Sequence, residues 1–129
     1  MRLLLDTHVA IWSLTDTRKL PAELLAMIAN RDNEVFVSAA SIWEIAIKFS
    51  LRRAGAPPFD GEDAVRHFKT VGYSFLDISV AHAAASGHLK TVHADPFDRL
   101  LIAQAVTEPL TLITRDSKVA DYSPTFITW

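Results

Sequence analysis

The sequence contains no cysteine and no long apolar run, and both absences exclude classes of protein. Without cysteine, the chain forms no disulfide, uses no thiol nucleophile and binds no zinc through thiolates. Although 50% of the residues are hydrophobic, no apolar run approaches the ~20 residues that span a bilayer. At the N-terminus, Asp6 interrupts the first apolar run too early for a secretory signal. We therefore expect a cytoplasmic protein with no membrane partner.

The sequence also lacks an excess of basic charge. Its 13 Lys and Arg residues stand against 15 Asp and Glu residues, which gives a net charge of -2 and a pI near 6.2. This balance excludes a general basic coating for nucleic acid, so any such contact must come from a local patch. The hydrophobic composition also suits self-association or a bound protein partner.

The hydrophobic pattern alternates between strands and helices. A chain of 129 residues suits one compact domain, which we expect to span 1–129. The pattern predicts strands at 2–5, 34–37, 110–114 and 125–129, with an ambiguous segment at 75–78. It predicts helices at 9–14, 21–30, 41–53, 62–71, 80–89 and 96–107, and an internal loop at 54–58. This alternation predicts an α/β fold with a parallel sheet between helical layers.

Four acidic residues follow predicted strands or open predicted helices. Asp6 and Asp116 come just after strands, where an aspartate caps a helix or forms a turn. Glu44 lies in 41-SIWE-44, which matches a capping box in which the glutamate bonds back to Ser41. Asp98 lies in 95-DPFD-98, which is typical of an N-cap, a proline in the first turn and an acid near the helix dipole. Taken singly, each acid has a purely structural explanation.

Taken together, the four acids share a placement that capping does not explain. The carboxyl ends of parallel strands meet at one edge of a sheet, so we expect Asp6, Glu44, Asp98 and Asp116 to converge there. Carboxylates brought close together raise one another's pKa unless a cation neutralises them. An open cup of oxygen ligands suits Mg²⁺ or Mn²⁺, which can activate water and stabilise charge on a phosphodiester. The pattern therefore predicts metal-dependent phosphodiester hydrolysis, with these four residues as catalytic metal ligands.

Small hydroxyl side chains lie beside the acids in the sequence. Thr7, Ser38 and Thr114 suit the orientation of carboxylates or water, and they suit backbone hydrogen bonds in turns equally well. The five histidines form no metal-binding pair such as HExxH, and His8 and His93 are near the acids by sequence only.

Basic and aromatic side chains also flank the acids. Lys48, Arg52 and Arg53 follow Glu44 near helical spacing and suit RNA phosphates, although the helix dipole also favours basic residues there. Next to two of the acids are Arg99 and Arg115, where a guanidinium binds phosphate or pairs with a carboxylate. For Trp12, Trp43 and Phe97, we expect core packing or a dimer interface ahead of base stacking.

Four segments, in this order and spacing, resemble the PIN-domain nucleases, specifically the VapC-type toxins of bacterial toxin–antitoxin pairs. They are 3-LLLDTHVAIW-12, 38-SAASIWEIAIK-48, 93-HADPFDRLLIAQA-105 and 112-LITRD-116. The resemblance covers essentially the whole chain and implies a PIN-like three-layer α/β/α fold with a small, mainly parallel sheet. It further implies a Mg²⁺- or Mn²⁺-dependent endoribonuclease that is inhibited by a cognate antitoxin and is usually dimeric, with higher toxin–antitoxin assembly.

The resemblance assigns the family's first, helical and last acids to Asp6, Glu44 and Asp116. Asp98 takes the third role because it stands seven residues before Ala105, as the family's Asp-x-Leu-Ile-Ala-Ala-x-Ala pattern requires. The role of Asp95 stays open between a helix cap, a group behind the ligands and an additional acid. The acidic pI departs from what a bare RNA-binding protein would show.

Two other functions stay open at this point. A receiver-like phospho-acceptor domain also has this length and an aspartate at a strand end, but it needs a pair of acids where Asp6 is followed by Thr7 and His8. A catalytically degenerate PIN domain would bind protein or RNA without cutting it.

Overall fold

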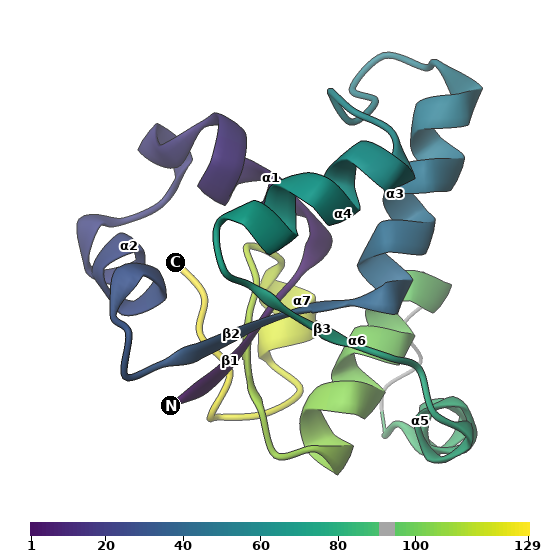
Figure 1. The fold of residues 1–129 in the computed structure, drawn as a ribbon. Coiled ribbons are helices and arrows are strands. Elements are labelled where there is room, and N and C mark those ends of the chain that lie inside the picture. Colours follow the sequence, from purple (N-terminus) through teal and green to yellow (C-terminus); the bar gives the residue numbers. More distant parts are fainter. Residues whose placement is uncertain (91–94) are drawn as a thin grey trace.

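The computed structural model describes residues 1–90 and 95–129 and places a parallel sheet at the centre (Figure 1). Its strands are β1 (Arg2–Leu5), β2 (Glu34–Ser38), β3 (Ser74–Leu76) and β4 (Thr111–Ile113). They lie in the order β3-β2-β1-β4, and each neighbouring pair is parallel. Because β1 lies between β2 and β4, the carboxyl ends of these three strands meet at one edge.

Helices surround this sheet. They are α1 (Thr7–Thr15), α2 (Ala22–Ala29), α3 (Ala39–Leu51), α4 (Gly61–Thr70), α5 (Val80–Ala85), α6 (Pro96–Thr107) and α7 (Ser117–Ala120). Two short 3-10 turns, η1 (Thr17–Lys19) and η2 (Ser86–His88), follow α1 and α5. In the part of the chain that the structure describes, no helix has the length and apolar character needed to cross a bilayer.

Alternate side chains of the strands point into two hydrophobic cores. On one face, Leu3 and Leu5 pack in a cluster with residues of α1 to α4, such as Phe68. On the other face, Leu4 packs in a cluster with residues of α6 and α7, such as Leu101. This alternation follows from the two-residue period of a strand. The molecule therefore has three layers, α/β/α, as the sequence predicted (Figure 1).

Most predicted elements are confirmed, but the strand predicted at 125–129 is wrong. A single residue of this segment, Ile127, pairs with the sheet, through an isolated bridge to Ile113. A turn in which the Phe126 amide donates to the Ser123 carbonyl precedes it, so the chain reaches β4 only at this point. The ambiguous segment at 75–78 contributes to β3, and the helix predicted at 80–89 ends as α5 at Ala85.

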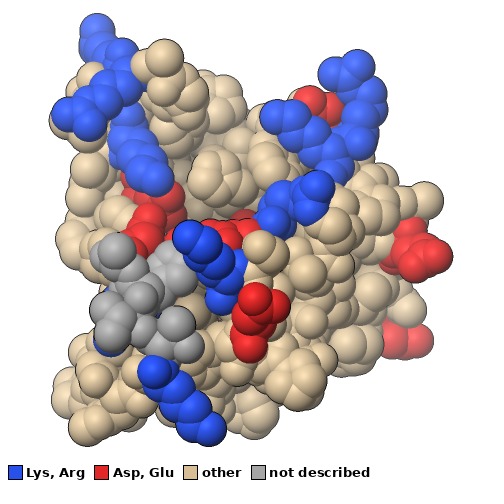
Figure 2. All heavy atoms as spheres, turned by 180° about the vertical axis from the view of Figure 1, so that it is seen from behind, with Lys and Arg blue, Asp and Glu red and all other residues tan. Residues whose placement is uncertain are grey.

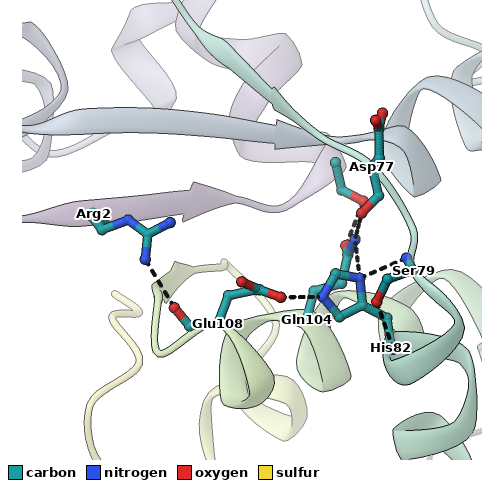
Figure 3. Close-up of polar contacts among 7 residues, drawn as sticks. Arg2, Asp77, Ser79, His82, Gln104 and Glu108 are labelled. Atoms are coloured by element: carbon teal, nitrogen blue, oxygen red, sulfur yellow. Dashed lines mark hydrogen bonds and ion pairs between the residues drawn. The ribbon is translucent and has the colours of Figure 1, made fainter.

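A network of polar side chains joins the end of β2 to α5 and α6, and Figure 3 shows its part around Gln104 and His82. The Gln104 side chain of α6 accepts a hydrogen bond from Ser38 at 2.5 Å and donates to the Asp77 carbonyl at 3.3 Å. His82 of α5 lies 2.7 Å from the Glu108 carboxylate through Nε2. Buried polar groups are costly unless they are paired. These bonds therefore fix the position of α6 relative to α5 and to the end of β2, where α3 begins.

Candidate metal and active site

A hollow of about 440 Å³ opens at the carboxyl edge of the sheet. Its walls come from the starts of α1, α6 and α7 and from one side of α3. All four acids singled out from the sequence line it, namely Asp6, Glu44, Asp98 and Asp116. The remaining lining residues are Thr7, His8, Trp12, Lys48, Asp95 and Arg115. The fold thus brings together four carboxylates that are far apart in the sequence.

Asp6 lies at the end of β1 and caps α1. Its Oδ1 accepts a hydrogen bond from the Val9 amide at 2.8 Å, as expected for an N-cap. The side chain is 7% exposed. Burial raises the pKa of the Asp6 carboxyl above 3.8 and the charge of Glu44 adds to the rise, whereas a hydrogen bond with Thr114 opposes it. Thr114 therefore touches a proposed ligand directly.

Glu44 lies inside α3, and the predicted capping box is wrong. The helix begins at Ala39 because Ser38 is its N-cap, whose hydroxyl accepts from the Ala40 amide at 2.9 Å. Glu44 is consequently in the second turn, only 5% exposed, and its side chain points to the hollow instead of back to the helix start. Thr7 donates to its Oε1 at 2.7 Å, and the Lys48 ammonium lies 2.5 Å from its Oε2.

Asp95 and Asp98 have different roles at the start of α6. Asp95 is the N-cap, since its Oδ1 accepts from the amides of Phe97 at 2.8 Å and Asp98 at 3.2 Å. Asp98 lies in the first turn and also lines the hollow. Partial burial raises the pKa of its carboxyl from 3.8 to about 7, and repulsion from Asp95, Asp6 and the other acids adds to the rise. The neighbouring carboxylates therefore add to the effect of burial at Asp98.

Asp116 follows β4 and caps α7, a short helix that the sequence did not predict. Its Oδ1 accepts from the Lys118 amide at 2.9 Å, and its own amide donates to the Thr114 hydroxyl at 3.0 Å. Thr114 therefore contacts the Asp6 side chain and the Asp116 backbone. Its burial and its two hydrogen bonds indicate that it orients the Asp6 carboxylate and fixes the backbone at Asp116.

The donor set fits a hard divalent cation, because carboxylate oxygens from four elements surround one hollow. Within residues 1–90 and 95–129, however, no three acids or histidines are grouped closely enough to hold an ion as they lie. Protein donors already occupy several of the oxygens, such as the Val9 amide on Asp6 and the Lys48 ammonium on Glu44. A cation would therefore share these oxygens with the donors or replace some of them.

Basic side chains surround the acids. Figure 2 shows Lys and Arg side chains on both sides of a hollowed face with Asp and Glu side chains deep within it. Lys48 and Arg115 line the hollow itself, and the Arg115 guanidinium lies 5.5 Å from the centre of the Trp129 ring. A second hollow, of about 390 Å³, shares Lys48 and Trp12 with the first and adds Lys19. Several basic side chains therefore lie next to the acids, and whether they contact RNA stays a prediction.

Some residues proposed from the sequence lie elsewhere. Arg52 is the C-cap of α3 and lines a groove against α4. The Arg99 guanidinium donates to the Ser86 carbonyl at 2.5 Å and is not among the described residues that line the hollow. Ser38 caps α3 and donates to Gln104, so its hydroxyl serves the fold, and it is not among the described residues that line the hollow. His93 lies outside the described residues.

Sequence reasoning missed two features of the site. Ser41 lies 2.9 Å from the Thr7 hydroxyl and so belongs to the buried hydrogen bonds around Glu44. The pairing of Lys48 with Glu44 was also missed, although a glutamate followed four residues later by a lysine on a helix is a known stabilising spacing. The capping-box interpretation of Ser41 and Glu44 concealed both features.

The chain is similar to known proteins in both sequence and structure. The PIN domain family matches residues 3–123. The chain is 30% identical over 123 residues to Ribonuclease VapC22 of Mycobacterium tuberculosis, covering 93% of this chain and 91% of that one. VapBC2 from Rickettsia felis, bound to a DNA fragment from its promoter, is similar with a TM-score of 0.68 and 20% identity, over 100% of this chain and 98% of that one. DNA-bound VapBC from Salmonella typhimurium is similar with a TM-score of 0.69 and 17% identity, over 100% and 97% of the two chains.

Proposed function

We propose, from the premise that this chain belongs to the PIN domain family, that it is a divalent-metal-dependent endoribonuclease and the toxin of a type II toxin–antitoxin system. Residues 1–129 would act as one PIN-like ribonuclease domain. The name of the relative VapC22 supports ribonuclease activity, and the VapBC structures of the same fold support the toxin assignment. The observation that carries the proposal is the meeting of Asp6, Glu44, Asp98 and Asp116 around one hollow.

In this proposal, the four carboxylates hold Mg²⁺ or Mn²⁺. When bound, the cation supplies positive charge for the acids and for the phosphodiester, and it favours the ionised form of an attacking water. The protein supplies position and charge. Thr7 holds the Glu44 carboxylate and Thr114 the Asp6 carboxylate. The basic residues at the hollow, Lys48 and Arg115, suit the phosphates of an RNA strand.

A cognate antitoxin protein and a second copy of the chain are the proposed protein partners. The similar solved structures are of VapBC, and the resemblance of this chain to VapC-type toxins supports neutralisation by such a partner. Large apolar side chains exposed on α3, namely Trp43, Ile47 and Leu51, are the kind of surface that a protein partner covers. We expect a homodimer, higher toxin–antitoxin assembly and action in the cytoplasm.

The test is cleavage of cellular RNA by the purified chain, with and without Mg²⁺. Wild type should cut RNA with Mg²⁺ and stop in EDTA, and its expression should arrest growth unless the antitoxin is co-expressed. Asp6→Asn and Asp98→Asn should remain folded and lose both effects. Asp32→Asn, which removes the same charge from an exposed loop, should keep them. Undiminished cleavage by the two site variants would refute the proposal, and antitoxin binding without any cleavage would favour a degenerate PIN domain.

A further inference from the structure

The Glu44 carboxylate is already neutralised by a cation of the protein itself. Lys48 lies one helical turn further along α3, and its Nζ is 2.5 Å from Glu44 Oε2. The other carboxylate oxygen accepts from Thr7 at 2.7 Å, so each oxygen already has a partner in the protein. The Glu44 side chain is 6% exposed, whereas that of Lys48 is 44% exposed. One partner is therefore fixed in the protein, and the other reaches it from the open side of the hollow.

We propose that Lys48 is an exchangeable counter-ion, which Glu44 gives up when it binds a divalent metal and which then binds a phosphate of the RNA substrate. This inference rests on the proposed function. It assigns to one residue two successive contacts, first with a proposed metal ligand and then with the substrate. RNA binding through Lys48 would thus depend on the presence of the metal.

The physical basis is the cost of burying an unpaired charge. A nearly buried carboxylate is strongly disfavoured without a cation, and breaking such a pair leaves that cost uncompensated. In the metal-free protein, the ion pair with Lys48 removes this cost at Glu44. An ammonium and a divalent ion repel each other strongly at contact distance, so Glu44 cannot keep both on the same oxygen.

The two hollows lined by Lys48 also provide space for the released ammonium. Lys48 lines both the hollow of the acids and the adjoining one, which together extend along α1 past Trp12. The flexible lysine stem can move its charge within this space without moving α3. A phosphate in the hollow would therefore meet an ammonium that no carboxylate neutralises. In the metal-free protein the same phosphate would meet a lysine that is paired with Glu44.

The direct test follows the side-chain ammonium of Lys48 by NMR in the full-length protein labelled with ¹⁵N-lysine. The Lys48 signal is identified by its loss in Lys48→Met. In EDTA, it should show the protection of an ion-paired ammonium, and addition of Mg²⁺ should move it toward the signals of exposed lysines such as Lys69 and Lys118. A Lys48 signal unchanged at saturating Mg²⁺ would overturn the proposal.

A second test measures Mg²⁺ affinity by calorimetry without RNA. Lys48→Met should bind Mg²⁺ about tenfold more tightly than wild type, because no ion pair has to be broken. Arg115→Met is the matched control, since it removes a positive charge from the same hollow without breaking the pair, and it should change the affinity much less. In a Glu44→Gln background, Lys48→Met should no longer tighten Mg²⁺ binding. If Lys48→Met and Arg115→Met change the Mg²⁺ affinity equally, Lys48 acts only through its positive charge near the metal, which would contradict the exchange.

These outcomes separate the inference from the proposed function. If wild type binds Mg²⁺ and cuts RNA while the Lys48 signal stays unchanged, the nuclease assignment stands and the exchange is wrong. If neither Mg²⁺ nor Mn²⁺ binds wild type, both are wrong. Lys48→Met should also be less stable than wild type in EDTA and recover in Mg²⁺, whereas Lys48→Arg should resemble wild type in both.

Discussion

Replacing Asp98 with asparagine should stabilise the metal-free protein. Burial and repulsion from the neighbouring acids raise the pKa of Asp98 from 3.8 to about 7, so the folded protein favours its neutral form. The stability that this contributes is complete below pH 3.8 and is lost as the pH rises through about 7. Ionising a fully buried group with this pKa would cost about 4 kcal/mol, and because Asp98 is only partly buried, screening by water reduces the cost to about 1–2 kcal/mol.

The assay is urea unfolding in EDTA, followed by circular dichroism. Near pH 8, Asp98→Asn should be more stable than wild type by about 1–2 kcal/mol, and the difference should shrink as the pH falls toward 4. Added Mg²⁺ at a hundred times its Kd should stabilise wild type by about 2.7 kcal/mol and the variant by much less. The control is Asp32→Asn, an equal change of charge on an exposed loop. The reasoning is refuted if Asp98→Asn gains no more stability than Asp32→Asn, or if the gain does not depend on pH.

Three further substitutions test the contacts around the site. Asp95→Ala should lower the free energy of unfolding in urea by about 1 kcal/mol, because the α6 cap is lost, whereas Asp95→Ser should keep both the cap and RNA cleavage. Loss of cleavage in the serine variant would show that Asp95 is an additional catalytic acid. Gln104→Leu should cost about 2 kcal/mol because it removes the acceptor of the Ser38 hydroxyl and a donor to the Asp77 carbonyl, and a neutral effect on unfolding would show that the network is dispensable. Thr7→Val should weaken Mg²⁺ binding more than Thr7→Ser does, measured by calorimetry, because only the serine keeps the hydroxyl on Glu44; equal binding by the two variants would deny Thr7 its orienting role.

Local signals in the sequence predicted the elements that position the site. The apolar run before Asp6 is an inner strand of the sheet, and Asp95-Pro96 does begin α6, with Asp98 in its first turn. A parallel sheet was predicted from the alternation of strands and helices, and the convergence of the acids follows from that topology. These features depend on hydrophobic period and capping chemistry, which are properties of short segments.

What the sequence could not predict depends on tertiary contacts. The capping-box pattern at Ser41 and Glu44 was misleading because Ser38, three residues earlier, is the N-cap of α3. The partner of Ser38 is Gln104, which is distant in the sequence, and no local pattern predicts a hydrogen bond of that kind. The strand predicted at 125–129 has suitable residues, yet a preceding turn allows it a single bridge to the sheet.

The central claim is that four carboxylates at the edge of the sheet hold one site for a divalent metal. Crystals of the wild-type protein grown with Mn²⁺ would locate the ion by its anomalous scattering. We predict an anomalous peak in the hollow, about 2–2.5 Å from carboxylate oxygens of at least two of Asp6, Glu44, Asp98 and Asp116, with Lys48 no longer in contact with Glu44. A peak bound elsewhere, or no peak in the hollow at saturating Mn²⁺, would contradict the account.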